Sequence, residues 1–365
     1  MKLFSCVCAQ LVFFESVSCI RCGKALAFLP DRAVVAAVVQ AAGGRGGEAT
    51  LWSAAADPGD GARYRRCRND REHGVCNWAV PVRDGEEYCR ACRLNQTIPD
   101  LGAPGAKEAW HRLEIAKRRL IYSLLELALP LEGKAQDPAR GLAFSFMKDD
   151  PAGAARVFTG HHDGLVTINA AEADAPFRER MRERMGETYR TLLGHFRHEI
   201  GHYYWDRLIA GSPWLPRFRE RFGDERADYA AAQRHHYEGG PPADWGDRFV
   251  SAYASVHPWE DWAETWAHYL HMADTLETAR AFGLALRPRP VADLPAGPPV
   301  EVRRLDLHSF DDLVSGWMPL TVALNGLNRS MGLPDPYPFV LAEPALEKLR
   351  FVHDVVENVG GGRAA

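Results

Sequence analysis

Three features are absent from the sequence, and each absence excludes a kind of site or partner. No cysteine follows residue 92 in a chain of 365 residues, so any cysteine-based site belongs to the N-terminal part. No apolar run approaches the roughly 20 residues that a transmembrane helix needs, so no membrane partner is expected. The formal net charge is only −4, which implies no overall attraction to nucleic acid or to an anionic membrane.

What remains is an ordinary globular composition, with 46% hydrophobic and 25% charged residues, and a length sufficient for two domains. The first residues include Lys2 and several apolar side chains, and they could be mistaken for a secretory signal. Cys6, Cys8 and Gln10 interrupt this apolar stretch, and no small-residue cleavage site precedes Glu15. We therefore expect a cytoplasmic protein.

The cysteines are arranged in short, repeated spacings. Two zinc sites with four thiolates each require such spacings, because each close pair forms a chelating turn. Four disulfides are the competing account, but Cys-x-x-Cys pairs without an export signal favour metal. We predict two structural zinc ions, bound by Cys6, Cys8, Cys19 and Cys22 and by Cys67, Cys76, Cys89 and Cys92.

Composition also divides the chain near residue 100. Residues 1–100 are predicted to form a tandem zinc-ribbon region with a flexible insertion, rich in Ala, Val and Gly, at about residues 31–50. A connector rich in Pro and Gly over residues 98–105 then leads to a second domain over residues 101–365. Five arginines between residues 63 and 71 form the main basic cluster. Acidic residues balance them, so we interpret the cluster as a solvated face and do not expect a nucleic-acid partner.

The second domain is predicted to begin with an amphipathic helix over residues 107–129. Its apolar residues, including Trp110, would face the core, and Lys117, Arg118 and Arg119 would form its wet face. Residues 142–147 and 157–169 have strand-like composition, with a turn near His161. Further helices are expected over residues 258–280, opened by a proline, and over residues 313–329.

The strongest motif lies on a helix predicted over residues 192–206. His198 and His202 are four residues apart, so both imidazoles lie on one helical face and can bind one Zn²⁺. Glu199 then falls beside the open coordination position, where it can take a proton from metal-bound water. A solvated helix face is the competing interpretation. The helix prediction rests on an apolar stripe at three- and four-residue steps, formed by Tyr189, Leu192, Leu193, Phe196, Ile200 and Tyr203.

Longer stretches resemble the bacterial zinc-binding metallopeptidases that carry an N-terminal zinc-ribbon domain. The resemblance covers nearly the whole chain. It departs at Cys6-Val-Cys8, where similar proteins have two residues between the cysteines, and this predicts a strained or weaker first zinc site. The matching segments are Cys67 to Cys92 with CRLN at residues 92–95, HFRHEIGHYYWD at residues 195–206, WEDWAETWAHY at residues 259–269 and LNGLNRS at residues 324–330.

The resemblance implies a third ligand for a catalytic zinc, which needs three protein donors and one open position. In gluzincin peptidases this donor is a glutamate on a later helix, and an acid four residues on holds a zinc-bound histidine. Glu260 as the ligand and Glu264 as the outer acid fit that spacing, while Glu264 or His268 as the ligand remains open. Tyr253 resembles the upstream tyrosine of lethal-factor type gluzincins and could stabilise the oxyanion.

We therefore predict an α+β fold in which two small zinc ribbons precede a mainly helical, zincin-like metallopeptidase domain with a small β-sheet. Its function would be hydrolysis of a peptide or protein substrate, with one catalytic and two structural zinc ions. One rival is a non-catalytic scaffold whose ribbons bind a protein partner, and another is a zinc-ribbon nucleic-acid binder. An intact Glu199 favours catalysis, because a scaffold needs no general base, and the acidic net charge disfavours the nucleic-acid binder.

Overall fold

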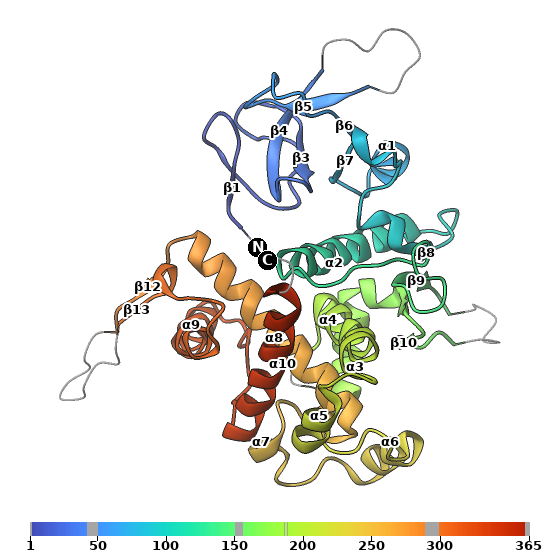
Figure 1. Cartoon of the computed structure of the whole chain (residues 1–365), viewed down its shortest axis with the longest axis vertical. Coiled ribbons are helices and arrows are strands. Elements are labelled where there is room, and N and C mark those ends of the chain that lie inside the picture. Colours follow the sequence, from blue (N-terminus) through green and yellow to red (C-terminus); the bar gives the residue numbers. More distant parts are fainter. Residues whose placement is uncertain are drawn as a thin grey trace. The chain divides into compact units, whose positions relative to one another are not determined.

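A computed structural model describes residues 2–41, 50–149, 156–185, 187, 189–288 and 299–361 (Figure 1). The chain divides into two compact units. The first comprises Met1–Ile121, Glu132–Thr159 and Thr167–Asp174, and the second comprises Tyr122–Leu131, Gly160–Val166 and Ala175–Ala365. Helices and small sheets occur together, so the predicted α+β class is confirmed.

The first unit opens with a hairpin of β1 (Phe4–Ser5) and β2 (Leu11–Val12). An antiparallel sheet of order β3-β4-β5-β6-β7 follows, and helix α1 (Arg68–His73) comes between its last two strands. Each strand pairs with the next one along the chain, which is the arrangement that short antiparallel connections produce. The strands are β3 (Leu26–Leu29), β4 (Val34–Gln40), β5 (Trp52–Ala54), β6 (Tyr64–Arg66) and β7 (Ala79–Pro81).

Strand β4 corrects the expectation of a flexible insertion at about residues 31–50. It pairs with β3 on one side and with β5 on the other, so that Ala37 lies opposite Leu26 and Val39 opposite Ser53. The run of valines therefore packs on a pleated surface, where β-branched side chains fit well. Residues 42–49, which include the glycines of the expected insertion, lie outside the described residues.

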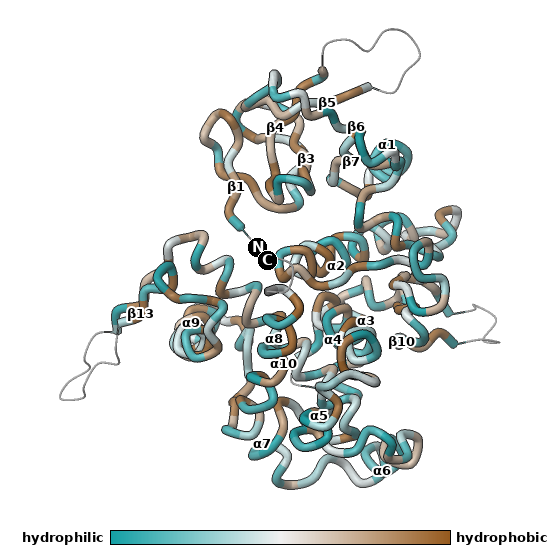
Figure 2. Tube along the Cα trace, viewed as in Figure 1, coloured by the Kyte–Doolittle hydropathy of each residue, from teal (hydrophilic) through white to brown (hydrophobic). Residues whose placement is uncertain are grey.

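The helix predicted over residues 107–129 is α2 (Ala106–Glu126), and Trp110 on its core side is fully buried. The expectation of a wet face is wrong for two of its three cations, because Lys117 and Arg118 are 0% and 2% exposed. Lys117 Nζ donates to Glu114 Oε1 at 2.8 Å and also to Asn95 Oδ1, so its charge is paired in the interior. Figure 2 shows hydrophilic and hydrophobic residues interleaved along this helix.

Strands appear where the composition predicted them. β9 (Ala143–Met147) pairs in parallel with β8 (Asn95–Thr97) and has β11 (Leu165–Asn169) on its other side. β10 (Gly160–His162) precedes β11, and Asp163 and Gly164 between them both have positive φ, as a tight turn requires.

The second unit is mainly helical. α4 (Leu192–Tyr204) begins at Thr191, whose hydroxyl accepts the N–H of Gly194 at 3.0 Å, and α8 (Pro258–Ala281) begins at His257, whose side chain caps Trp259. Among the described residues, no helix combines the length and the apolar character needed to cross a membrane. The remaining elements are α3 (Ala175–Met185), α5 (Leu215–Phe222), α6 (Tyr229–Gly239), α7 (Trp245–Arg248), α9 (Phe310–Ser330), α10 (Glu343–Gly361) and the paired strands β12 (Ala285–Leu286) and β13 (Val300–Glu301).

Helices α4 and α8 pack closely, and α10 packs against α8 (Figure 1). The close approach occurs at Gly201, where an added Cβ would lie 2.9 Å from Ala263 Cα and 3.2 Å from Trp266 Cβ. Trp262 Nε1 also donates to the carbonyl oxygen of Gly201 at 2.8 Å. Because Gly201 lies between His198 and His202, this contact sets the position of both histidines relative to α8.

We predict that Gly201→Ala lowers the free energy of unfolding by about 1–3 kcal/mol, because the new methyl group would overlap backbone atoms of α8, which can move away only if the helix itself shifts. Chemical denaturation followed by circular dichroism measures this change. Gly326→Ala in α9 is the matched control, because a Cβ there meets nothing within 4 Å. It should stabilise the helix by up to about 1 kcal/mol. Equal effects of the two substitutions would contradict the prediction.

Candidate metal centres

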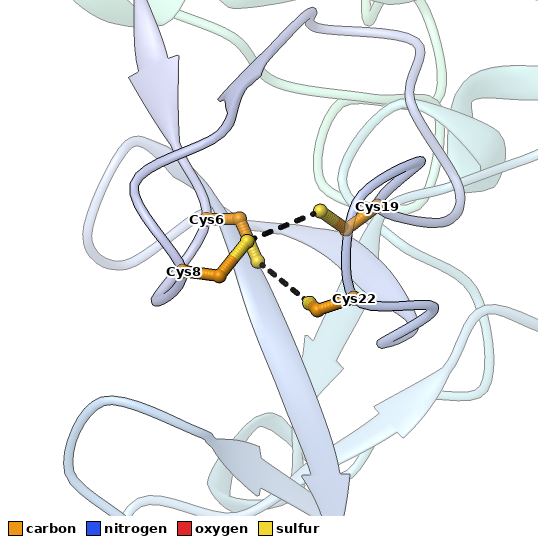
Figure 3. A group of neighbouring side chains, drawn as sticks. All are labelled: Cys6, Cys8, Cys19 and Cys22. Carbon is orange, nitrogen blue, oxygen red and sulfur yellow. Dashed lines mark hydrogen bonds between the residues drawn. The ribbon is translucent and has the colours of Figure 1, made fainter.

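The first cysteine cluster is formed by two loops, with Cys6 and Cys8 on one and Cys19 and Cys22 on the other (Figure 3). Sγ of Cys6 lies 3.6 Å from that of Cys22, and Sγ of Cys8 lies 3.6 Å from that of Cys19. The shorter Cys6-x-Cys8 spacing therefore still brings both sulfurs into the cluster. The backbone N–H of Cys22 lowers the pKa of the Cys19 thiol to about 6, and Gly23, at φ +69°, forms the turn that follows.

The second cluster is buried completely. It consists of Cys67, Cys76, Cys89 and Cys92, with Sγ of Cys76 3.7 Å from Sγ of Cys89. The backbone N–H groups of Cys89, Trp78 and Cys92 each lie 3.4 Å from a cluster sulfur. Such donors stabilise thiolate, the form of cysteine that binds metal.

Both clusters have the dimensions of thiolate metal sites. All eight cysteines are free, and the sulfur atoms of Cys6 and Cys22, of Cys8 and Cys19, and of Cys76 and Cys89 are 3.6, 3.6 and 3.7 Å apart, whereas a disulfide needs about 2.05 Å. Four sulfurs arranged tetrahedrally at about 2.3 Å from one zinc ion would be about 3.8 Å apart. The competing account of four disulfides is therefore wrong, and the donor sets fit zinc.

A group of charges on α2 lies against the second cluster. Arg118 Nη1 donates to the carbonyl oxygen of Val75 at 2.6 Å. Glu114 Oε2 lies 3.8 Å from Cys92 Sγ and 3.8 Å from Arg118 Nη1. Burial raises the pKa of Glu114, but Lys117 and Arg118 outweigh burial and hold it below its usual value.

This buried group contains two cations, Lys117 and Arg118, and one carboxylate, Glu114. An uncompensated charge in the interior is costly unless an opposite charge lies nearby. Four thiolates around one Zn²⁺ carry a net charge of about −2 in formal terms. The cationic excess on α2 therefore fits a metal-loaded thiolate cluster better than four neutral thiols.

Two arginines near this cluster, Arg66 and Arg68, have acidic partners. Arg66 pairs with Asp70, and Arg68 pairs with Glu72 and Glu87. For these two arginines, the interpretation as a balanced, solvated face is confirmed.

Helices α4 and α8 bring together His198, His202 and Glu260. The Nε2 atoms of the two histidines are 3.2 Å apart, and Glu260 Oε2 lies 3.0 Å from His198 Nε2 and 3.5 Å from His202 Nε2. Glu260 is 2% exposed, and its Oε2 has no hydrogen-bond partner. Burial opposes ionisation of Glu260, but the two histidines hold its pKa well below its usual value. Two imidazoles and one carboxylate form a donor set that fits zinc with an open fourth position.

Glu264 holds His198 from the opposite side of the imidazole ring. Its Oε1 lies 2.7 Å from His198 Nδ1, and its Oε2 accepts the hydroxyl of Ser251 at 2.6 Å. His268 is turned to another partner, with its Nδ1 2.8 Å from the hydroxyl of Tyr337. The geometry therefore favours Glu260 over Glu264 and His268 as the third donor.

Two further residues predicted for catalysis lie beside this site. Glu199 follows His198 on α4 and is 8% exposed, and burial raises the pKa of its carboxyl group. Tyr253 lies in a short 3₁₀ turn, Tyr253–Ser255, with its ring centroid 5.9 Å from that of His198. Burial raises the pKa of Tyr253, so its phenol stays protonated and can donate a hydrogen bond.

Some contacts at this site could not be read from the sequence. The hydroxyl of Tyr229 on α6 donates to Glu260 Oε1 at 2.6 Å, and Gln233 Nε2 donates to that hydroxyl at 2.8 Å. Neither residue has a characteristic spacing from the His-Glu-x-x-His (HExxH) motif at residues 198–202. By contrast, His161 accepts the N–H of Gly164 at 3.0 Å, as expected for a turn residue.

Comparison with known proteins gives two family matches and a set of relatives. Residues 106–355 match a family described as "Putative zinc-binding metallo-peptidase", and residues 3–103 match a zinc-ribbon domain. Uncharacterized proteins of Mycobacterium bovis and of two Mycobacterium tuberculosis strains are 44% identical over 362 residues, covering 98% of this chain and 96% of each relative. No solved structure matches the chain.

We predict that Arg118→Met lowers the free energy of unfolding by about 3–5 kcal/mol, because it removes a buried cation and leaves the Val75 carbonyl without its donor. Chemical denaturation of the zinc-loaded protein measures the loss. Arg112→Met is the control, since Arg112 lies on the same helix and also donates to a backbone carbonyl but is exposed. Its effect should stay within about 0.5 kcal/mol. A similarly small effect of Arg118→Met would show that Arg118 does not stabilise the cluster.

Proposed function

This chain belongs to the zinc-binding metallo-peptidase family, and on that premise we propose that it is a gluzincin-like enzyme that hydrolyses peptide bonds. The observation that carries the proposal is the approach of Glu260 Oε2 to the Nε2 atoms of His198 and His202, at 3.0 and 3.5 Å. These three residues would hold the catalytic zinc, and the two cysteine clusters would hold structural zinc. The ribbons would occupy residues 1–100 and the catalytic region residues 101–365.

When bound, zinc supplies Lewis acidity that polarises a carbonyl group and makes water a nucleophile near neutral pH. Glu199 would accept the proton of the attacking water and later give it to the leaving amine. Its burial supports this role, because a carboxyl group whose pKa is raised accepts and returns a proton more readily near neutral pH.

Glu264 and Tyr253 would assist without binding the metal. Glu264 accepts the Nδ1 proton of His198, which fixes the tautomer that leaves Nε2 free to act as a donor. Tyr253, protonated and next to His198, would donate to the oxyanion that develops on the substrate carbonyl. A peptide or protein would be the substrate, and eight free cysteines fit a reducing compartment such as the cytoplasm.

We expect three zinc ions per chain in protein purified without added metal, measured by elemental analysis. Two would belong to the cysteine clusters and one to His198, His202 and Glu260. His202→Ala should reduce the count to two, because it removes one of only three protein donors. A wild-type count below three, or an unchanged count in His202→Ala, would contradict the assignment.

Glu199→Gln should keep all three zinc ions and the fold but reduce hydrolysis roughly 10²- to 10⁴-fold, because the proton acceptor is lost while every metal donor remains. Turnover of a peptide library, followed by mass spectrometry, measures the loss. Glu264→Gln is the comparison, since it should weaken zinc binding by about 10- to 100-fold as an outer contact of His198. Wild-type turnover by Glu199→Gln on a peptide that the native protein cleaves would leave the scaffold as the better account.

A further inference from the structure

Glu260 presents two oxygens with different surroundings. Oε1 accepts the phenol of Tyr229 at 2.6 Å, whereas Oε2 has no hydrogen-bond partner and faces the two histidines. Both oxygens belong to a side chain that is 2% exposed, so bulk water does not compete for them. Oε1 therefore binds the phenol of Tyr229, whereas Oε2 faces the proposed metal position.

Tyr229 is itself held on several sides. Gln233, one turn later on α6, donates to its hydroxyl at 2.8 Å. Its ring contacts those of His257 and Trp259, with centroids 5.3 and 6.1 Å away. These contacts fix the phenol relative to the first turn of α8, where Glu260 lies.

The side chain of His257 joins the same two segments through backbone groups. His257 Nε2 lies 3.1 Å from the carbonyl oxygen of Ala227, and His257 Nδ1 accepts the N–H of Trp259 at 3.1 Å. The imidazole therefore links the residues just before α6 to the N-terminus of α8. None of the residues of α6 is buried. These contacts, and not burial in a core, therefore hold the first turn of α6 beside Glu260.

We propose that Tyr229 is a positioning residue that restricts Glu260 to coordination through Oε2 alone. A carboxylate can bind a metal through one or both oxygens, and a second oxygen on zinc would take a position that water or substrate needs. By occupying Oε1, the phenol keeps that position open. This inference rests on the proposed function, because it assumes that Glu260 is a zinc ligand.

The test uses the full-length protein with zinc retained in its cysteine clusters and Co²⁺ placed in the histidine–glutamate site. Four-coordinate Co²⁺ absorbs visible light much more strongly than five-coordinate Co²⁺. Tyr229→Phe keeps the ring and removes only the hydroxyl, so it should weaken this absorption as Oε1 joins the metal. Chelator competition should also show metal affinity falling roughly 10- to 100-fold, the usual effect of losing an outer contact.

Tyr122→Phe is the matched control, because it also removes only a hydroxyl that donates to a glutamate, Oε1 of Glu277 at 2.7 Å, and Glu277 lies near the opposite end of α8 from Glu260. It should change neither the spectrum nor the affinity. A wild-type spectrum in Tyr229→Phe would overturn the proposal, even if affinity fell, because the phenol would then not limit how Glu260 binds.

Glu260→Gln separates this proposal from the proposed function. It should abolish or strongly weaken metal binding at the histidine site. If the wild-type protein binds no metal there, or if Glu260→Gln binds it equally well, the proposed metal centre fails and the role of Tyr229 fails with it. If Glu260→Gln loses the metal and Tyr229→Phe behaves as wild type, the centre stands and only the role of Tyr229 is refuted.

Discussion

The close packing of α4 against α8 depends on the absence of a side chain at Gly201. A Cβ there would lie 2.9 Å from Ala263 Cα, so only glycine allows the helices to approach this closely without a shift. The contact lies between His198 and His202 on one helix and between Glu260 and Glu264 on the other. Each helix supplies a pair of polar residues one turn apart, and the glycine brings the two pairs within hydrogen-bonding distance.

The second constraint is that a buried charge needs an opposite charge beside it. It applies at the histidine–glutamate site and beside the second cysteine cluster. Glu260 stays ionised in a buried position because its attraction to two histidines outweighs the cost of burial. Glu114 stays ionised because its attraction to Lys117 and Arg118 outweighs the same cost. Neither carboxylate would be tolerated alone in the interior. The polar groups around the proposed metals are thus part of what makes the surrounding core stable.

The sequence predicted those features that depend on local periodicity. The apolar stripe of α4, the four-residue spacing of His198 and His202, and the proline at the start of α8 are all signals within one helix. It misjudged Lys117 and Arg118, because a cation on a helix looks solvated until the partner that buries it is known. It also missed Tyr229, whose hydrogen bond to Glu260 joins residues 31 positions apart with no repeating spacing between them.

The salt-bridged face of α2 bears on how this architecture could have been assembled. The helix begins after the residues that match a zinc ribbon, yet its Glu114 and Arg118 contact Cys92 and Val75 within that ribbon. A ribbon exchanged as a cassette at the connector would leave those partners behind. Shuffling of this module between proteins would therefore require a breakpoint after α2, or compensating changes on it, so ribbon and helix are expected to be inherited as one piece.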